Sequence, residues 1–123
     1  MSIKLLRLNE QVYFELKLIA AEINSKGIRP FLEDVFTHIA SSATEIGGIT
    51  LIDPNKTGSE KSVGVDLHTK QAQQLNIISA TRKTSMTNFL ESICVWLANE
   101  HRANGRVWID DTPVRALPVR MRK

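Results

Sequence analysis

The side chains that most often carry catalysis are few in this chain of 123 residues, and they are scattered along it. Its three histidines, His38, His68 and His101, lack the short spacings of metal-binding motifs. Its one cysteine, Cys94, cannot form an internal disulfide bond or a cysteine-based zinc site. Asp110-Asp111 is a carboxylate pair without a partner, and the sequence has no glycine-rich phosphate loop. The sequence therefore predicts a protein that is not an enzyme and that needs no metal or cofactor.

The sequence is better suited to binding phosphate groups than to catalysis. Arg82-Lys83-Thr84-Ser85 places two cations and two hydroxyls directly before an apolar segment with helical spacing. The free amides at the amino end of a helix attract anions, and neighbouring cations strengthen that attraction. The first half of the chain carries Lys26, Gly27 and Arg29 before its own apolar segment. A capped helix with solvated charges is the alternative interpretation of the 82–85 turn.

The charge of the chain is uneven. Residues 1–60 contain six Lys/Arg and eight Asp/Glu, a net charge of −2, whereas residues 61–123 contain ten and five, a net charge of +5. A basic half is typical of a chain that binds a polyanion, although a merely solvated surface gives the same imbalance. Arg7 and Asn9 interrupt the first apolar residues, so neither a signal peptide nor a membrane span is expected. We expect a cytoplasmic protein without membrane contact.

The two halves of the chain resemble each other. Residues 31–35 (FLEDV) match residues 89–93 (FLESI) at an offset of 58. Upstream apolar positions match at an offset of 59, which indicates one extra residue between the helices of the first half. We therefore predict one domain, residues 1–111, made of two repeats, 1–60 and 61–111, with a linker at about 54–61 and a basic tail at 112–123, extended or disordered.

Within each repeat the hydrophobic period changes from that of a strand to that of a helix. Val63, Val65 and Leu67 alternate with polar residues, which predicts a half-buried strand. Residues 72–79 then have a helical apolar face, and residues 89–97 form a wider apolar stripe. The first repeat follows the same plan, so each repeat is expected to contain a strand and two helices.

Several residues are suited to the beginnings of these helices. Asn9 and Thr69 are expected to cap the first helix of each repeat, and Thr84 or Ser85 the second helix of the second repeat. Pro30 suits the first position of a helix, where its missing amide is not needed. Short strands are expected after the second helices, at residues 49–52 and 107–109.

The order of a short strand, a helix, a tight turn and a longer apolar helix resembles the ribbon-helix-helix (Arc/MetJ-like) superfamily of DNA-binding proteins. The resemblance covers residues 2–41 and 62–99. It implies an α+β fold in which two units pair their strands in an antiparallel ribbon and interlock their helices. The two repeats could pair within one chain as a pseudo-dimer, or each could pair with its counterpart in a homodimer. We favour internal pairing, because the segment between the repeats can span on the order of 60 Å.

The resemblance also implies where DNA would bind. In the superfamily the ribbon lies in the major groove, and outward strand side chains contact base edges. The base-contacting residues would be Lys4, Leu5, Arg7, Ser62, Gly64 and Asp66. The phosphate-binding residues would be Lys26, Gly27, Arg29, Arg82, Lys83, Thr84 and Ser85. Lys4 falls on the opposite face from Arg7 but lies near the strand end.

The predicted partner is double-stranded DNA. The resemblance implies a transcriptional repressor or an accessory factor of a plasmid or another mobile element. Gly64 has no side chain and Asp66 would repel phosphates, which motivates an alternative: a protein-interaction module that keeps the fold without specific DNA binding. A third hypothesis is an antitoxin whose tail from Thr112 folds on a toxin.

Overall fold

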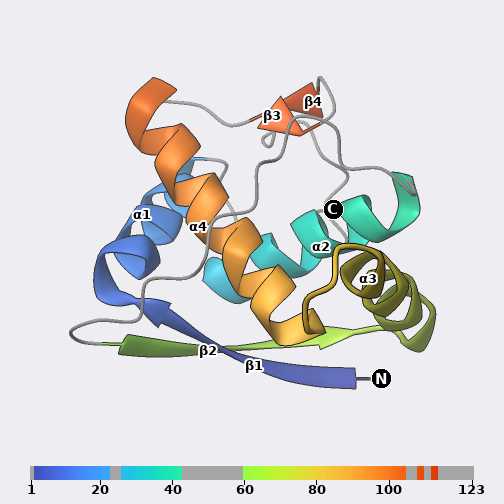
Figure 1. Ribbon diagram of the computed structural model, residues 1–123. Coiled ribbons are helices and arrows are strands. Elements are labelled where there is room, and N and C mark those ends of the chain that lie inside the picture. The colour runs from blue at the N-terminus through green and yellow to red at the C-terminus, as the bar shows by residue number, and fades with distance from the viewer. Residues whose placement is uncertain (1, 23–25, 43–59, 105–107, 110–111, 114–123) are drawn as a thin grey trace.

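The computed structural model describes residues 2–22, 26–42, 60–104, 108–109 and 112–113. Its elements are β1 (Ser2–Asn9), α1 (Glu10–Glu22), α2 (Ile28–Ser42), β2 (Glu60–Leu67), α3 (Thr69–Thr81), α4 (Met86–Asn104), β3 (Trp108–Ile109) and β4 (Thr112–Pro113) (Figure 1). This is an α+β fold, which confirms the predicted class. The order of strand, helix, helix occurs at 2–42 and again at 60–104.

β1 and β2 form a two-stranded antiparallel ribbon within the chain. Ser2 lies opposite Leu67 at one end of the ladder, and Asn9 lies opposite Glu60 at the other. Glu60 and Lys61 therefore belong to β2, whereas the sequence analysis placed them in the linker. The strands come from the two halves of the chain, so the ribbon joins them into one structure.

The ribbon is buried on one face only. Leu6 and Leu8 of β1 lie on the same face as Val63, Val65 and Leu67 of β2, and all five side chains are buried. Successive side chains of a strand point to opposite faces, so the residues between them lie on the outer face. The alternation predicted for residues 63–67 is confirmed by their burial pattern.

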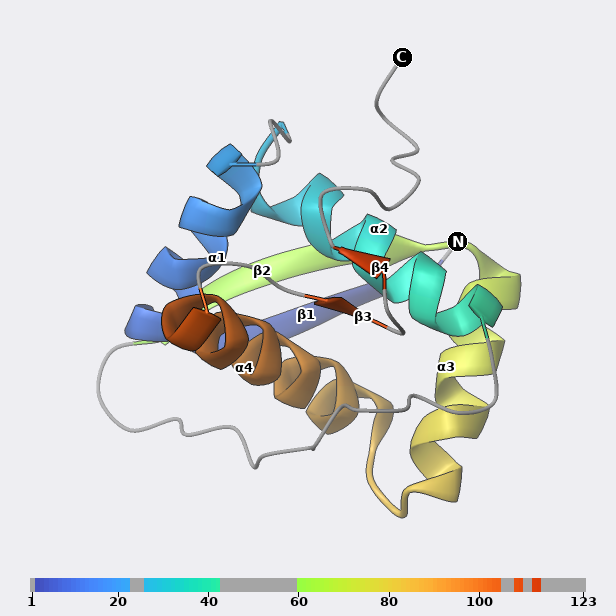
Figure 2. The same cartoon turned by 90° about the horizontal axis from the view of Figure 1, so that it is seen from above.

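α1, α2 and α4 cover the inner face of the ribbon, and α3 lies to the side, packed against α2 and α4 (Figure 2). α1 packs against α4 and α2 against α3, so each helix pair joins the two halves, as the view from above shows (Figure 2). Phe31, Phe36 and Phe89 are fully buried between these layers. Burying a side chain of this size contributes about 1.5–3 kcal/mol, so the core gives each helix a fixed place above the ribbon. Among the described residues, no element covers the outer face.

Two helix beginnings agree with the sequence analysis. Asn9 Oδ1 accepts a hydrogen bond from Gln11 N at 2.8 Å, which caps α1. Ser85 Oγ accepts one from Asn88 N at 3.1 Å, which caps α4. Each bond satisfies an amide that has no partner inside its helix.

Two other helix beginnings differ from the prediction. Thr69 is the first residue of α3, and His68 occupies the capping position without a side-chain hydrogen bond. Pro30 is the third residue of α2, because Gly27 O accepts the first helical hydrogen bond, from Phe31 N at 3.4 Å. Proline is tolerated there for the expected reason, since amides of the first turn need no helical acceptor.

The short strand predicted at 107–109 is found as β3, at Trp108–Ile109. It pairs with β4, whose two residues the sequence analysis assigned to the extended or disordered tail. β3 and β4 lie on the side of the helices away from the ribbon (Figure 1). The strand predicted at 49–52 lies outside the described residues, as do residues 54–59 of the linker and the tail from 114. None of the helices in the described part of the chain has the length and apolar character needed to cross a bilayer.

Candidate nucleic-acid interface

The structure brings most of the predicted base-contacting residues together on the outer face of the ribbon. Arg7 lies opposite Ser62 and Leu5 opposite Gly64, while Asp66 is on the same face. Arg7 and Ser62 are exposed, and Leu5 is 55% exposed. These positions form one surface, which we call the outer ribbon face: Ile3, Leu5, Arg7, Ser62, Gly64 and Asp66.

Two details of this face differ from the sequence analysis. Lys4 is half-buried on the inner face, opposite Val65, and so stands apart from the other predicted base-contacting residues. Ile3 was not predicted, yet it is 72% exposed on the outer face opposite Asp66. The two-residue alternation with Leu5 was sufficient to find Ile3.

A buried glutamate holds each strand at its outer edge. Arg7 N of β1 donates to Glu91 Oε2 of α4 at 2.8 Å, and Asp66 N of β2 donates to Glu33 Oε2 of α2 at 2.6 Å. In an antiparallel pair alternate amides point away from the partner strand, and these are two such amides. We call Glu33 and Glu91 the ribbon glutamates. Each one ties a helix of one half of the chain to the strand of the other.

The sequence analysis did not recognise the ribbon glutamates as functional. Glu33 and Glu91 are 7% and 1% exposed and stand at equivalent positions of the repeated FLE segment. A charged residue inside an apolar helical stripe needs a partner, because burying it alone is costly. Its occurrence at the same place in both halves was the signal that pointed to a structural role.

At the amino end of α2, a cation lies beside the ribbon. Glu33 Oε2, which accepts the bond from Asp66 N, also lies 3.1 Å from Arg29 Nε, and the Arg29 side chain is about half exposed. Gly27, which precedes α2, has a φ of +133°, a conformation that side chains rarely adopt. Lys26 is exposed beside it. Three predicted phosphate-binding residues thus gather at one helix end next to the ribbon.

The turn before α4 is tightly held by backbone hydrogen bonds. Lys83 N donates to Ala80 O at 2.9 Å, and Thr84 N donates to Ser79 O at 3.0 Å. Lys83 has a φ of +59°, in the left-handed region where a residue with a Cβ costs roughly 1–2 kcal/mol. Its side chain is exposed. Non-glycine residues in this conformation are most often found where the surrounding structure or a function requires them.

The two hydroxyls of this turn are already engaged as acceptors. Ser85 Oγ caps α4, and Thr84 Oγ1 accepts a hydrogen bond from Asn88 Nδ2 at 2.8 Å. A hydroxyl that accepts can still donate its own hydrogen to a phosphate oxygen. The turn, with Arg82 beside it, therefore combines a helix amino end, cations and two hydroxyl donors.

Two side chains of the helical layer, those of His101 and Cys94, have shifted pKa values. His101, in the last turn of α4, contacts Glu15 Oε2 of α1 through Nδ1 at 2.6 Å and Glu22 Oε2 through Nε2 at 2.9 Å. Burial alone would lower the pKa of His101, but its hydrogen bonds to the two glutamates outweigh that effect and raise it. Burial, reinforced by Glu91, raises the pKa of the Cys94 thiol, which fits a core residue rather than a reactive one.

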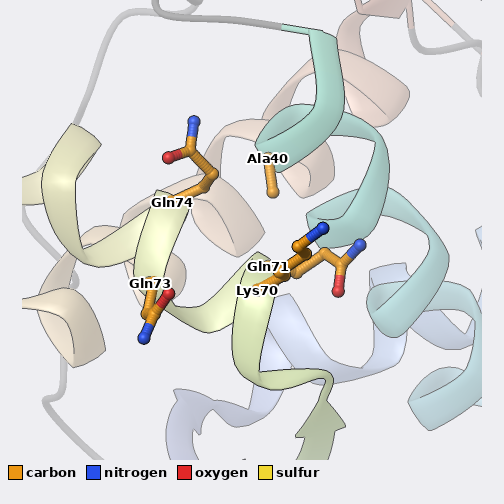
Figure 3. A pocket seen from close by; sticks show the side chains of 5 residues that line it. All are labelled: Ala40, Lys70, Gln71, Gln73 and Gln74. Atoms are coloured by element: carbon orange, nitrogen blue, oxygen red, sulfur yellow. The ribbon is translucent and has the colours of Figure 1, made fainter.

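An open pocket of about 380 Å³ lies between α2 and α3. Its lining is Ala40, Lys70, Gln71, Gln73 and Gln74 (Figure 3). The glutamine side chains offer hydrogen-bonding groups, and none of the described residues of the lining carries a carboxylate, thiol or imidazole. Within the described ranges, no group of three or more histidine, cysteine, aspartate or glutamate residues is placed to hold a metal ion.

Comparison of the chain with protein-family models, with curated proteins and with solved structures finds no match.

Proposed function

We propose that this protein binds double-stranded DNA, with the ribbon in the major groove and the amino ends of α2 and α4 against the phosphate backbone. The major groove admits a two-stranded ribbon, and outward strand side chains then meet base edges. The proposed setting is the cytoplasm, in a transcriptional repressor or an accessory factor of a plasmid or other mobile element. In this proposal the strand-helix-helix segments 2–42 and 60–104 act as two ribbon-helix-helix units paired within one chain.

One observation carries the proposal: no element of the described residues covers the outer ribbon face, and helix amino ends with cations flank it. Arg7 is exposed on this face. Arg29 is tied to the glutamate that holds β2, and Lys83 is exposed before α4. A free helix amino end and a nearby cation together form a phosphate-binding arrangement. Two such arrangements beside one ribbon match the two backbones that border a groove.

The proposal is tested by fluorescence anisotropy with a random duplex at several salt concentrations. Binding is expected to weaken as salt rises, because phosphate contacts release counterions from DNA. If Lys26, Arg29, Arg82 and Lys83 each contact a phosphate, log K falls against log [salt] with a slope of roughly −3 to −4. Absence of binding at low salt would refute the proposal.

Matched variants separate the proposed surface from general charge effects. Lys83→Ala removes one phosphate contact and is expected to make the slope shallower by about 1. Lys17→Ala removes an exposed lysine in the middle of α1, outside that surface, and should leave the slope unchanged. Equal effects of the two substitutions would mean that binding depends on net charge and not on the α4 turn.

A protein-interaction module is the second candidate function. Ile3 and Leu5 leave apolar side chains exposed on the outer ribbon face, and such a patch can contact a protein as well as a base. In that case Ile3→Ala and Leu5→Ala would weaken a protein complex, and the random duplex would show no salt-dependent binding.

A further inference from the structure

The ribbon glutamates define an approximate two-fold relation between the two strands. Arg7 and Asp66 donate their amides to equivalent glutamates on α4 and α2. In the ladder, Arg7 lies two residues beyond Leu5, and Asp66 lies two residues beyond Gly64, which is opposite Leu5. The centre of the relation is therefore the Leu5–Gly64 pair. Every other position of one strand has a counterpart about this centre.

On the inner face, the fully buried positions obey this relation. The counterparts there are Leu6 with Val65 and Leu8 with Leu67, and all four are buried and apolar, whereas the half-buried Lys4 has the apolar Val63 as its counterpart. The outer face does not obey it, since the counterparts are Ile3 with Ser62, Leu5 with Gly64 and Arg7 with Asp66. In each of these outer pairs the β1 residue is apolar or basic, whereas its β2 counterpart is small, polar or acidic.

We infer that the chain recognises an asymmetric DNA site whose bases are selected mainly by β1, whereas β2 contributes little to base choice. This inference rests on the proposed function. Ile3 and Leu5 present apolar surface suited to the methyl group of thymine, and Arg7 presents a guanidinium suited to guanine. The selected site therefore contains thymines where Ile3 and Leu5 make contact and a guanine where Arg7 makes contact.

β2 offers little to a base edge. Gly64 has no side chain, and Ser62 has a short hydroxyl that bonds to any base. Asp66 Oδ1 is buried and accepts no hydrogen bond from the described residues, so this oxygen is turned away from the outer surface. The β2 half of the ribbon can lie against DNA without strongly preferring a sequence.

The spacing of the β1 side chains sets the length of the selected site. Outward residues of a strand follow one another at about 6.8 Å, and base pairs along a duplex at about 3.4 Å. Contacts from Ile3, Leu5 and Arg7 therefore fall about two base pairs apart. The selected segment spans roughly five base pairs, with thymines toward one end and guanine at the other.

The first experiment is selection of duplexes by the full chain from a library with a random window of about two helical turns. The expected result is an enriched site that is not palindromic and that is defined at the base pairs contacted by Ile3, Leu5 and Arg7. A palindromic site would overturn the inference while leaving DNA binding intact. If no duplex is enriched and none binds at low salt, the proposed function fails and the inference fails with it.

The second experiment replaces each thymine of the selected site by uracil, which removes only the methyl group. Affinity should fall about threefold to fivefold for each contacted methyl group. The same replacement should have no effect on Leu5→Ala at the position that Leu5 contacts. Leu18→Ala is the matched control, because Leu18 is also 55% exposed but lies on α1. Equal sensitivity of the two variants would overturn the inference.

A third experiment gives β2 the side chains of β1, with Ser62→Ile, Gly64→Leu and Asp66→Arg together. A Cβ at Gly64 meets no atom within 4 Å, and all three positions lie on the outer face, so the fold should tolerate these changes. The variant should now prefer a palindromic site, in which the bases selected by β1 are repeated on the opposite DNA strand, over the original sequence. Retention of the wild-type preference would contradict the assignment of base choice to the outer ribbon face.

Discussion

The ribbon glutamates allow a sharp test of how the ribbon is held. Glu91→Ala removes the acceptor of Arg7 N and leaves a ribbon-edge amide without its protein partner. Such a loss costs about 1–3 kcal/mol. Removal of the buried carboxylate also relieves its desolvation cost, which offsets part of the loss of packing. We expect a net loss of about 2 kcal/mol in unfolding free energy, and a Tm lower by roughly 8 °C.

The assay with the highest resolution is amide hydrogen exchange followed by NMR. In Glu91→Ala the amide of Arg7 should lose protection, whereas the amide of Asp66 keeps its bond to Glu33. In Glu33→Ala the pattern should reverse. Because the change crosses from one strand to the other, general destabilisation cannot produce it. Equal loss of protection at both amides in both variants would refute the reasoning.

A conservative substitution provides the control. Glu91→Gln keeps an acceptor oxygen of nearly the same reach but removes the charge, so it should cost less than about 1 kcal/mol. Urea denaturation of the wild type and the two variants gives these differences directly. If glutamine is as damaging as alanine, the charge of Glu91 matters more than its hydrogen bond to the ribbon.

Four further predictions follow from single sites. His101→Gln should destabilise the protein most below about pH 6.5. A histidine whose pKa is raised by folding stabilises the protein fully below its unfolded-state pKa, and this stabilisation is lost as pH rises through its folded-state pKa. Urea denaturation from about pH 6 to pH 9 should therefore show a shrinking difference in unfolding free energy between variant and wild type. Lys83→Gly should raise Tm, since glycine adopts its positive φ without strain, while weakening DNA binding in the anisotropy assay. Ser85→Ala should cost about 1 kcal/mol in urea denaturation by uncapping α4, with no effect if the hydroxyl is dispensable. Gly64→Ala should leave Tm unchanged or higher, because a Cβ there meets open space, and a lower Tm would show that this part of the ribbon is misplaced.

The hydrophobic pattern was sufficient to predict the four helices, the two ribbon strands and the buried face of the ribbon, whereas β4 was assigned to the tail. The alternation of Val63, Val65 and Leu67 placed β2, and its burial has the same period. The helix caps were less predictable, because several hydroxyl and amide side chains stand near each helix beginning. Asn9 and Ser85 were correctly chosen, whereas Thr69 lies one residue inside its helix. Local sequence does not distinguish these cases, since tertiary packing fixes the first helical residue.

The candidate site was predicted in part for a related reason. Strand alternation placed Leu5 and Arg7 on one face, but whether the strands pair, and in which register, depends on contacts between distant residues. The bond from Asp66 N to Glu33 joins positions 33 residues apart, and that from Arg7 N to Glu91 joins positions 84 apart. No local pattern contains such contacts.

Covalent connection of the two strands changes what the ribbon can select. In a symmetric dimer of identical chains, every position on one strand is repeated on the other, so a side chain suited to one half-site is imposed on both. Here the two strands belong to one chain, so each outer position is free to differ from its counterpart. The inner face cannot differ as freely, because both strands must fill the same core. The contrast between the matched, fully buried pairs of the inner face and the unmatched outer face is what this constraint predicts for a ribbon that selects an asymmetric site.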